Sequence, residues 1–449
     1  MSANGSELAE WVLQQARKSG ASAAEVIIVN AEGLSAGVRL GRVEKLKSSR
    51  DRRVGIRVFT GQSAATASTA EFERDSLAQF VAETVELAKL TAPDPWSGLP
   101  DPSLHPKNLP ELELADAVGG RIDAERALEH ARETEAAALG SDPRIKNSEG
   151  AEFDAGFHQV TFANSQGFIG QYGTTAYSLS VAPVAQDGDS MQRDHWYSMS
   201  RRYDKLESAD SIGRTAAMRT LRRLGARKVK TTRAPVIFDP DMAAGLIRSL
   251  VGAACGPALY KGASFLLGKL GQQVASPRVT IIDDALMRGG LGSKPFDGEG
   301  LATRRQTVVD KGVLATYLLD SYSARKLKLE STGSASRGIG DGPGVSSTNL
   351  YLEPGAYTPE EIIASVQSGL FVTELIGFGV NSVTGDYSRG ASGIWIENGK
   401  LTYPCQEITI AGNLKEMFLS IEMIGNDLTW KSSVASPTLK ISEMTIAGS

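Results

Sequence analysis

The chain has 449 residues, which at roughly 150 residues per domain predicts two or three domains with enough chain for a sizeable core. Its 48 basic and 52 acidic residues leave a formal net charge of −4, which excludes a strongly basic nucleic-acid-binding protein or a polybasic membrane binder. The four histidines are His105, His130, His158 and His195. The C-terminal half therefore cannot build a histidine-based metal site or catalytic triad from its own residues.

The cysteine content and the hydropathy pattern indicate the compartment. Cys255 and Cys405 are too few for a disulfide framework and fit a reducing environment. No apolar run approaches the ~20 residues that cross a bilayer, and the first residues lack a secretory signal pattern. We expect a soluble, cytoplasmic protein.

The N-terminal segment alternates helices with short strands. Apolar residues at helical spacing predict a helix that ends at Gly20 and a second helix that begins at Asp75 and ends before Pro93. Between them we expect an antiparallel meander with turns at Glu32-Gly33 and Thr60-Gly61. Its predicted strands are residues 25–30, 34–40, 43–47, 54–59 and 63–68.

A proline-rich stretch separates this segment from a second one like it. Six of the 18 prolines fall within residues 93–110, which excludes a helix or a central strand there and predicts an extended connector. We then expect a helix over 123–139, a glycine-punctuated β region over 145–199 and a helix over 208–224. The first half therefore consists of two helix-flanked β modules.

Arginine and lysine side chains gather before the C-terminal half, between residues 214 and 233. A nucleic-acid groove would need interleaved aromatic residues, which this stretch lacks, so we interpret it as a solvated helix face and linker. A strand over 235–238 follows, and Asp239-Pro240 then forms an N-cap with proline at the first helical position. That helix extends to about Ala254.

Strands and turns dominate the remainder, with further helices expected near 359–369 and 413–421. The predicted fold class is α+β, with helix-flanked β modules in the N-terminal half and a β-rich, barrel-like C-terminal domain. The predicted divisions are an N-terminal module (1–92), a connector (93–110), a central module (111–226) and the C-terminal domain (233–449).

Few residues in this pattern suggest chemistry by themselves. Asp283, Asp284, Asp297 and Glu299 lie at strand ends and could hold a divalent cation or form an acid/base pair, although turns use the same residue types and are the favoured interpretation. The glycine-rich stretch 338–344 is not followed by a helix, so we favour a flexible loop over a phosphate site. Cys255 ends an apolar helix, where a buried, inert thiol is expected.

Several spaced segments together carry a resemblance to a known family. They are residues 53–59 with Gly61, 260–271, 279–284, 292–300, 303–305, 317–327, 349–355 and 425–427. These segments resemble the TldD/PmbA family, also called the modulator of DNA gyrase family, and in particular its PmbA (TldE) branch. The resemblance covers nearly the whole chain.

The resemblance implies a two-subunit metallopeptidase in which a TldD-type chain pairs with a TldE-type chain around a chamber for unfolded peptide. It implies substrates such as precursors of peptide antibiotics and antitoxin-like proteins. The TldD-type partner carries a His-Glu-x-x-x-His helix and a C-terminal cysteine, which together hold zinc, leave a position for water and supply a glutamate as general base.

This chain departs from that zinc motif at every position. Counted back from Lys261-Gly262, the positions of the motif's histidine, glutamate and second histidine are Ile247, Arg248 and Gly252. The ligand cysteine belongs after residues 425–427, yet no cysteine follows Cys405. The resemblance therefore implies no zinc, no other cofactor and no catalytic residue in this chain, with zinc held by the partner.

Our leading hypothesis is a non-catalytic TldE-type subunit that closes the chamber, positions a TldD-type partner and holds extended peptide against sheet edges. The candidate peptide-binding residues are Asn381, Tyr387, Ser388, Arg389 and Ser392. A stand-alone hydrolase built on the four carboxylates and a gyrase-associated regulator without enzymatic activity remain as alternatives. We expect no direct nucleic-acid or membrane contact, and a homodimer is possible for the isolated chain.

Overall fold

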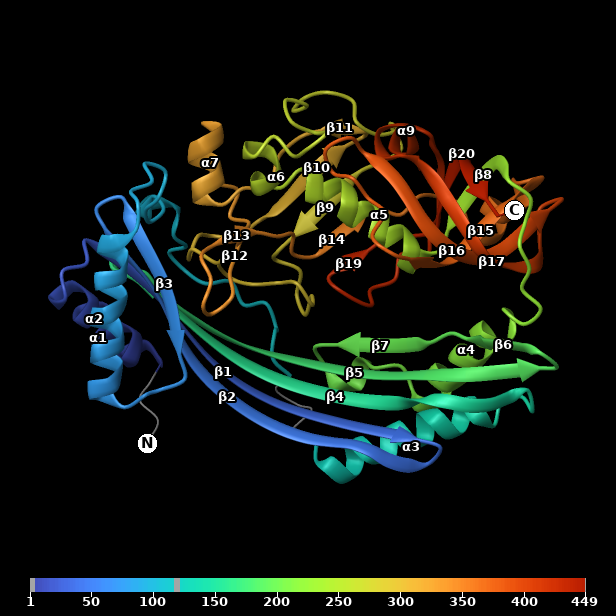
Figure 1. Ribbon diagram of the computed structural model, residues 1–449, viewed down its shortest axis with the longest axis horizontal. Coiled ribbons are helices and arrows are strands. Elements are labelled where there is room, and N and C mark those ends of the chain that lie inside the picture. The colour runs from blue at the N-terminus through green and yellow to red at the C-terminus, as the bar shows by residue number, and fades with distance from the viewer. Residues whose placement is uncertain (1–4, 117–121, 449) are drawn as a thin grey trace.

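The structure is a computed structural model and describes residues 5–116 and 122–448. A long, curved antiparallel sheet forms one layer, the C-terminal half lies over one face of it, and helices cover the other face (Figure 1). Alternation of side chains along strand β1 (Ala23–Arg39) explains this arrangement, because successive residues point to opposite faces. Val26 and Ile28 pack with helices α1 (Gly5–Lys18) and α2 (Arg74–Leu90), whereas Ile27 packs with Phe296 of the C-terminal half.

The sheet has seven strands in the order β3-β2-β1-β4-β5-β6, with β7 paired to β5. Its other strands are β2 (Arg42–Thr60), β3 (Ser63–Thr69), β4 (Ile145–Asn164), β5 (Ile169–Asp187), β6 (Ser190–Arg193) and β7 (Trp196–Ser200). The helices of this half are α1 (Gly5–Lys18), α2 (Arg74–Leu90), α3 (Ala124–Leu139) and α4 (Ala209–Leu221), close to the predicted positions.

The two predicted β modules share this one sheet, because β1 pairs with β4 along most of its length. The predicted turn at Glu32-Gly33 is wrong: Gly33 continues β1 and is paired with Ser49 on one side and Gly156 on the other. The predicted strands 43–47 and 54–59 likewise merge into β2. The turn after Thr60 is confirmed, with Gly61 at φ 64°.

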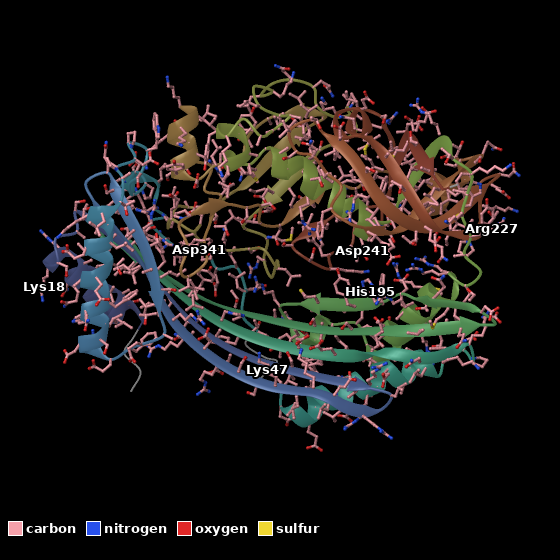
Figure 2. The ribbon with its side chains drawn as sticks, viewed as in Figure 1. Lys18, Lys47, His195, Arg227, Asp241 and Asp341 are labelled. Carbon is pink, nitrogen blue, oxygen red and sulfur yellow. The ribbon has the colours of Figure 1, made fainter. Side chains whose placement is uncertain are left out.

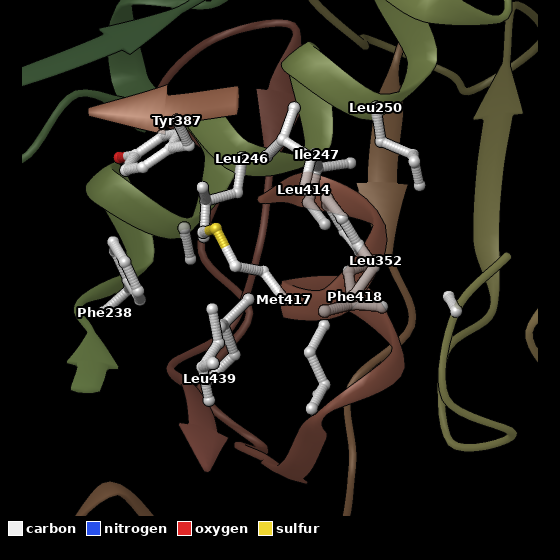
Figure 3. Packing of buried hydrophobic residues seen from close by; sticks show 14 of the residues in the cluster. Phe238, Leu246, Ile247, Leu250, Leu352, Tyr387, Leu414, Met417, Phe418 and Leu439 are labelled. Carbon is white, nitrogen blue, oxygen red and sulfur yellow. The ribbon is translucent and has the colours of Figure 1, made fainter. Parts of the chain in front are cut away.

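The C-terminal half contains a barrel of five strands, closed by pairing of β17 with β20, and this confirms the predicted α+β class with a barrel-like C-terminal domain. Helix α5 (Pro240–Ala253) packs its apolar side chains into the same core as the barrel (Figure 3). The barrel strands and the adjoining β18 are β8 (Thr232–Phe238), β15 (Ser368–Ile376), β16 (Asp386–Glu397), β17 (Lys400–Asn413), β18 (Ile421–Ile424) and β20 (Leu439–Ala447).

Shorter elements complete this half. The strands of the second sheet are β9 (Ile281–Asp284), β10 (Arg305–Asp310), β11 (Val313–Leu314), β14 (Leu350–Leu352) and β19 (Val434–Ala435), and β12 (Ala335–Ser336) pairs with β13 (Gly344–Val345). The helices α8 (Pro359–Ala364) and α9 (Leu414–Leu419) were predicted, whereas α6 (Gly256–Tyr260) and α7 (Ser321–Leu327) were not.

The connector is extended apart from one short 3-10 turn, η1 (Pro102–Leu104), and it fastens the two halves together. The Tyr322 hydroxyl donates to Asp94, the Arg325 guanidinium donates to the Trp96 carbonyl, and a His105 ring nitrogen lies 2.8 Å from the Gly300 carbonyl. A second 3-10 turn, η2 (Tyr203–Lys205), precedes α4. No helix among the described residues is long and apolar enough to span a bilayer.

Candidate functional site

Helix α5 forms one wall of the candidate site, and its start is set by the sequence. The Asp239 carboxylate accepts a hydrogen bond from the Met242 amide, and Pro240 occupies the first helical position, as predicted. The helix is amphipathic, with Leu246 and Leu250 among the side chains that it buries in the core.

The three positions that the resemblance leads us to expect for the family's zinc motif have three different environments. Ile247 is completely buried in the core beside Leu246 and Leu414 (Figure 3). Arg248 is exposed and lines a cavity. Gly252 is also exposed, and a Cβ atom added there would meet no atom within 4 Å.

The cavity beside Arg248 has a volume of about 380 Å³ and lies between the N-terminal sheet and the barrel. Its walls come from the β7 region (His195, Trp196), from α5 (Asp241, Arg248) and from the segment that precedes and includes β19. Figure 2 labels His195 and Asp241, which lie on opposite sides of it. That last segment, residues 429–435, lies where the resemblance leads us to expect the family's ligand cysteine. The helix that would carry the motif's histidines and the segment that would carry its cysteine therefore border the same cavity.

An ion-pair network crosses this cavity. Lys431 Nζ lies 3.2 Å from Asp241 Oδ2 and 2.8 Å from the centroid of the Trp196 ring. Arg219 Nε lies 3.4 Å from Asp194 Oδ2, and Arg219 Nη1 lies 3.6 Å from Asp239 Oδ2. These contacts join the central module to the C-terminal domain.

The network corrects one expectation from the sequence. The basic stretch was interpreted as a solvated helix face, yet the side chains of Arg219 and Arg223 are only 10% and 12% exposed. Both arginines pair with carboxylates, since Arg223 bonds Glu374 of β15. Burial raises the pKa of Asp239 to about 6, although the nearby Arg219 opposes this shift.

The pKa values of two groups that line the cavity, Lys431 and Tyr197, are shifted by burial and by neighbouring charges. Burial lowers the pKa of Lys431, and its partner Asp241 opposes that effect. The pKa of Tyr197 is raised, chiefly by burial and then by Asp241, while the positive charge of Arg248 acts in the opposite direction. Arg248 and Tyr197 both line the cavity.

These residues do not fit a zinc ion. An isoleucine alkyl group and a glycine offer no donor atom, and the guanidinium of Arg248 would repel a cation. Among residues 5–116 and 122–448, no group of three or more histidine, cysteine, aspartate or glutamate side chains is placed to hold a metal ion.

The five candidate peptide-binding residues are near one another in sequence but have different surroundings. Asn381 is exposed in the loop before β16, and its side-chain oxygen accepts from the Val383 amide. Tyr387 is 2% exposed and packs in the barrel core, Ser388 is exposed and Arg389 is half-buried. Ser392 is buried at the edge of a second cavity.

This second cavity, of about 630 Å³, lies next to the first, and Glu374 lines both. Residues of β4 and β5 with Arg193 form one side of it, and residues of β15, β16 and β17 form the other. Strand β16 is paired with β15 and β17 on its two sides, so most of its backbone is already hydrogen-bonded.

The four carboxylates considered for a divalent ion each accept a hydrogen bond from a backbone amide, which for Glu299 is that of Ser321. Asp283 accepts from the Thr348 amide and hydroxyl, and Asp284 accepts from the Leu286 amide. Asp297 accepts from the amides of Glu299, Leu301 and Ala335. The contacts of Asp284 with Leu286 and of Asp297 with Glu299 and Leu301 are the turn chemistry that the sequence favoured, whereas the Thr348 and Ala335 donors come from distant segments.

Sequence reasoning identified Arg248 but missed the other residues around the first cavity. Asp241, Lys431, Trp196 and Tyr197 are separated by up to 235 positions, and nothing in their local patterns links them. The one available signal was the segment 428–435, which follows residues 425–427, where the resemblance leads us to expect the family's ligand cysteine.

Comparison with known proteins identifies one family along most of the chain. Residues 24–88, 119–224 and 231–448 match the family models for domain 1, the central domain and the C-terminal domain of the PmbA/TldA metallopeptidases. The chain is 39% identical over 425 residues to "Metalloprotease PmbA" of Escherichia coli O157:H7, covering 95% of this chain and 92% of the relative.

Two solved structures have the same fold. A putative modulator of DNA gyrase from Bacteroides thetaiotaomicron superposes with a TM-score of 0.93 at 31% identity, over the full length of both chains. TldE from Thermococcus kodakarensis superposes with a TM-score of 0.88 at 22% identity, covering 98% of this chain and 100% of that one. The three family models and the PmbA relative establish that the chain belongs to the PmbA/TldD metallopeptidase family.

Proposed function

We propose that this chain is the non-catalytic, TldE-type subunit of a two-subunit TldD/TldE metallopeptidase that processes or degrades unfolded peptides, with zinc in the TldD-type partner. The observation that carries the proposal is the set of side chains that line the cavity between α5 and residues 429–435. The cationic side chains of Arg248 and Lys431 line this cavity, whereas Ile247 packs in the core. A hydrolytic zinc site needs neutral or anionic donors at such positions.

The N-terminal sheet offers a place for extended peptide. Strand β3 pairs only with Val54–Thr60 of β2, so residues 42–53 of β2 have no strand on their outer side among the described residues. An open edge of this kind accepts an extended chain through backbone hydrogen bonds, in the manner of strand addition. The exposed side chains of residues 42–51 leave that edge accessible.

The alternative hydrolase has less support. Asp284 and Asp297 already accept backbone hydrogen bonds within their own turns, and Asp283 accepts one from the distant Thr348 amide. Asp297 and Glu299 are each 2% exposed. Asp283, Asp297 and Glu299 are buried, so no substrate reaches these three groups without opening the C-terminal half.

Co-expression with a TldD-type chain from the same cell tests the proposal. We expect a stable hetero-oligomer on gel filtration, zinc in the complex by mass spectrometry, and chelator-sensitive cleavage of an unfolded peptide. The isolated chain should hold no stoichiometric zinc and cleave nothing. Stoichiometric zinc together with chelator-sensitive cleavage by the isolated chain would overturn the proposal.

A further inference from the structure

The cavity beside Arg248 contains equal numbers of positive and negative side chains, but they are unevenly paired. Its cations are Arg219, Arg248 and Lys431, and its carboxylates are Asp194, Asp241 and Glu374. Each of these carboxylates lies within salt-bridge distance of a cation, through Arg219, Lys431 and Arg223 respectively. The carboxylates are therefore neutralised within the protein.

Arg248 is the exception. Among the residues that the structure describes, no carboxylate lies within salt-bridge distance of its guanidinium, which is exposed to the cavity. The other cations have fixed partners: Lys431 is 9% exposed between Asp241 and Trp196, and Arg219 is 10% exposed between Asp194 and Asp239. One guanidinium without a carboxylate partner among the described residues thus faces a cavity whose lining carboxylates are each already within salt-bridge distance of another cation.

The rest of the wall limits what can bind there. Trp196, Met242, Leu375 and Val434 give the cavity an apolar side, and Thr429 and Ser432 add hydroxyl groups. Its volume of about 380 Å³ is at the lower end of the ~300–1,000 Å³ typical of small-ligand sites. A guanidinium beside an apolar wall suits a carboxylate attached to an apolar group, because the planar fork pairs with two carboxylate oxygens.

We propose that this cavity binds a peptide carboxylate through Arg248, with the adjoining apolar side chain against Trp196 and Leu375. The inference builds on the proposed function, since it assigns the position of the missing zinc site a role in holding the peptide. The carboxylate comes from the C-terminus of the peptide or from an acidic side chain, and the two sources share the same chemistry.

Binding of three peptides to the full-length chain tests this site by isothermal titration calorimetry. The first is N-acetyl-Gly-Ala-Val-Phe with a free C-terminal carboxylate, the second is its C-terminal amide, and the third is N-acetyl-Gly-Glu-Val-Phe amide. We expect at least one carboxylate-bearing peptide to bind at least tenfold more tightly than the neutral amide. The one that binds identifies the source of the carboxylate.

Variants assign the effect to Arg248. Arg248→Ala should abolish the preference for carboxylate, and Arg248→Lys should retain part of it because the charge remains without the planar fork. Arg278→Ala is the matched control, because Arg278 is exposed and lies outside the cavity. Far-UV circular dichroism and thermal unfolding of each variant establish that it is folded.

Three results would overturn the site: equal affinities for all three peptides, no binding of any of them, or a carboxylate preference that survives in Arg248→Ala. The outcomes separate this inference from the proposed function. If Arg248 binds carboxylate but no TldD-type complex forms, the site is supported and the proposed function is not. If the complex forms but no carboxylate preference is found, the proposed function is supported and the site is not.

Discussion

Arg337 Nη1 donates a hydrogen bond of 2.6 Å to Glu25 Oε1, and both side chains are 1% exposed. Glu25 is on β1 of the N-terminal sheet, and Arg337 follows β12 of the C-terminal half. A second arginine, Arg57 of β2, lies 3.6 Å from the same carboxylate oxygen. This buried ion pair is a contact between the two halves, in addition to the connector.

Glu25→Gln should lower the free energy of unfolding by about 3–5 kcal/mol, because it leaves the Arg337 charge buried without its counter-charge. Arg337 Nε and Nη2 are already buried without hydrogen-bond partners, so no other group is in place to compensate. Urea denaturation followed by circular dichroism measures the loss. Asp210→Asn breaks the exposed Asp210–Arg214 pair and should change stability by less than about 0.5 kcal/mol. Equal effects of the two substitutions would contradict this account.

The pH dependence of stability should include a contribution from Glu299. Burial, followed by the charges of Asp297 and Asp320, raises its pKa to about 8. Because the unfolded carboxyl titrates near its ordinary value of 4.5, the folded state retains a proton that the unfolded state releases between about pH 4.5 and 8. Glu299 therefore makes the protein less stable as pH rises through that window.

Glu299→Gln keeps the oxygen that accepts from the Ser321 amide but removes the titration. Its unfolding free energy should fall with pH less steeply than that of the wild type, by up to about 1.4 kcal/mol per pH unit. Denaturant titrations at several pH values between 5 and 8 measure the two slopes. Glu330→Gln, at an exposed position, should leave the slope unchanged. Parallel curves for Glu299→Gln and the wild type would refute the assignment.

The elements with strong local signals were predictable from the sequence. Asp239-Pro240 determines where α5 begins, and the spacing of apolar residues located α1 to α4. The long strands were not predictable, because a glycine such as Gly33 indicates a turn when only its neighbours in the sequence are considered. Its place within β1 depends on Ser49 and Gly156, and a Cβ atom there would lie 3.0 Å from the Ser49 hydroxyl oxygen.

The candidate site was likewise predictable only where its residues have a local signal in the sequence. The alignment located Ile247, Arg248 and Gly252 on one helix, which is a local property of the chain. It could not show that Arg219 and Arg223 are buried, because their partners Asp194 and Glu374 come from distant strands or their ends. Whether a charge is solvated or paired depends on tertiary contacts that are absent from the local pattern.

Both thiols should be unreactive in the folded protein. Burial raises the pKa of Cys255 to about 12 and that of Cys405 to about 11, so almost no thiolate forms at pH 8. We expect no measurable reaction with Ellman's reagent in native buffer, and reaction of both cysteines after unfolding in guanidinium chloride. Cys255→Ser and Cys405→Ser, each alone, assign any residual signal. Rapid stoichiometric labelling of the native chain would contradict the raised pKa values of these two thiols.

The two motif positions on either side of Arg248 should respond in opposite ways to alanine. Ile247→Ala should cost about 2–5 kcal/mol, because Ile247 is completely buried and the substitution leaves a cavity in the core. Gly252→Ala should stabilise the protein by up to about 1 kcal/mol, because Gly252 is an exposed helical residue with open space around its Cβ position. Urea denaturation of both variants under the same conditions measures the difference. A loss of stability in Gly252→Ala, or none in Ile247→Ala, would mean that α5 is oriented differently from its position here, and the assignment of Arg248 to the cavity would fall with it.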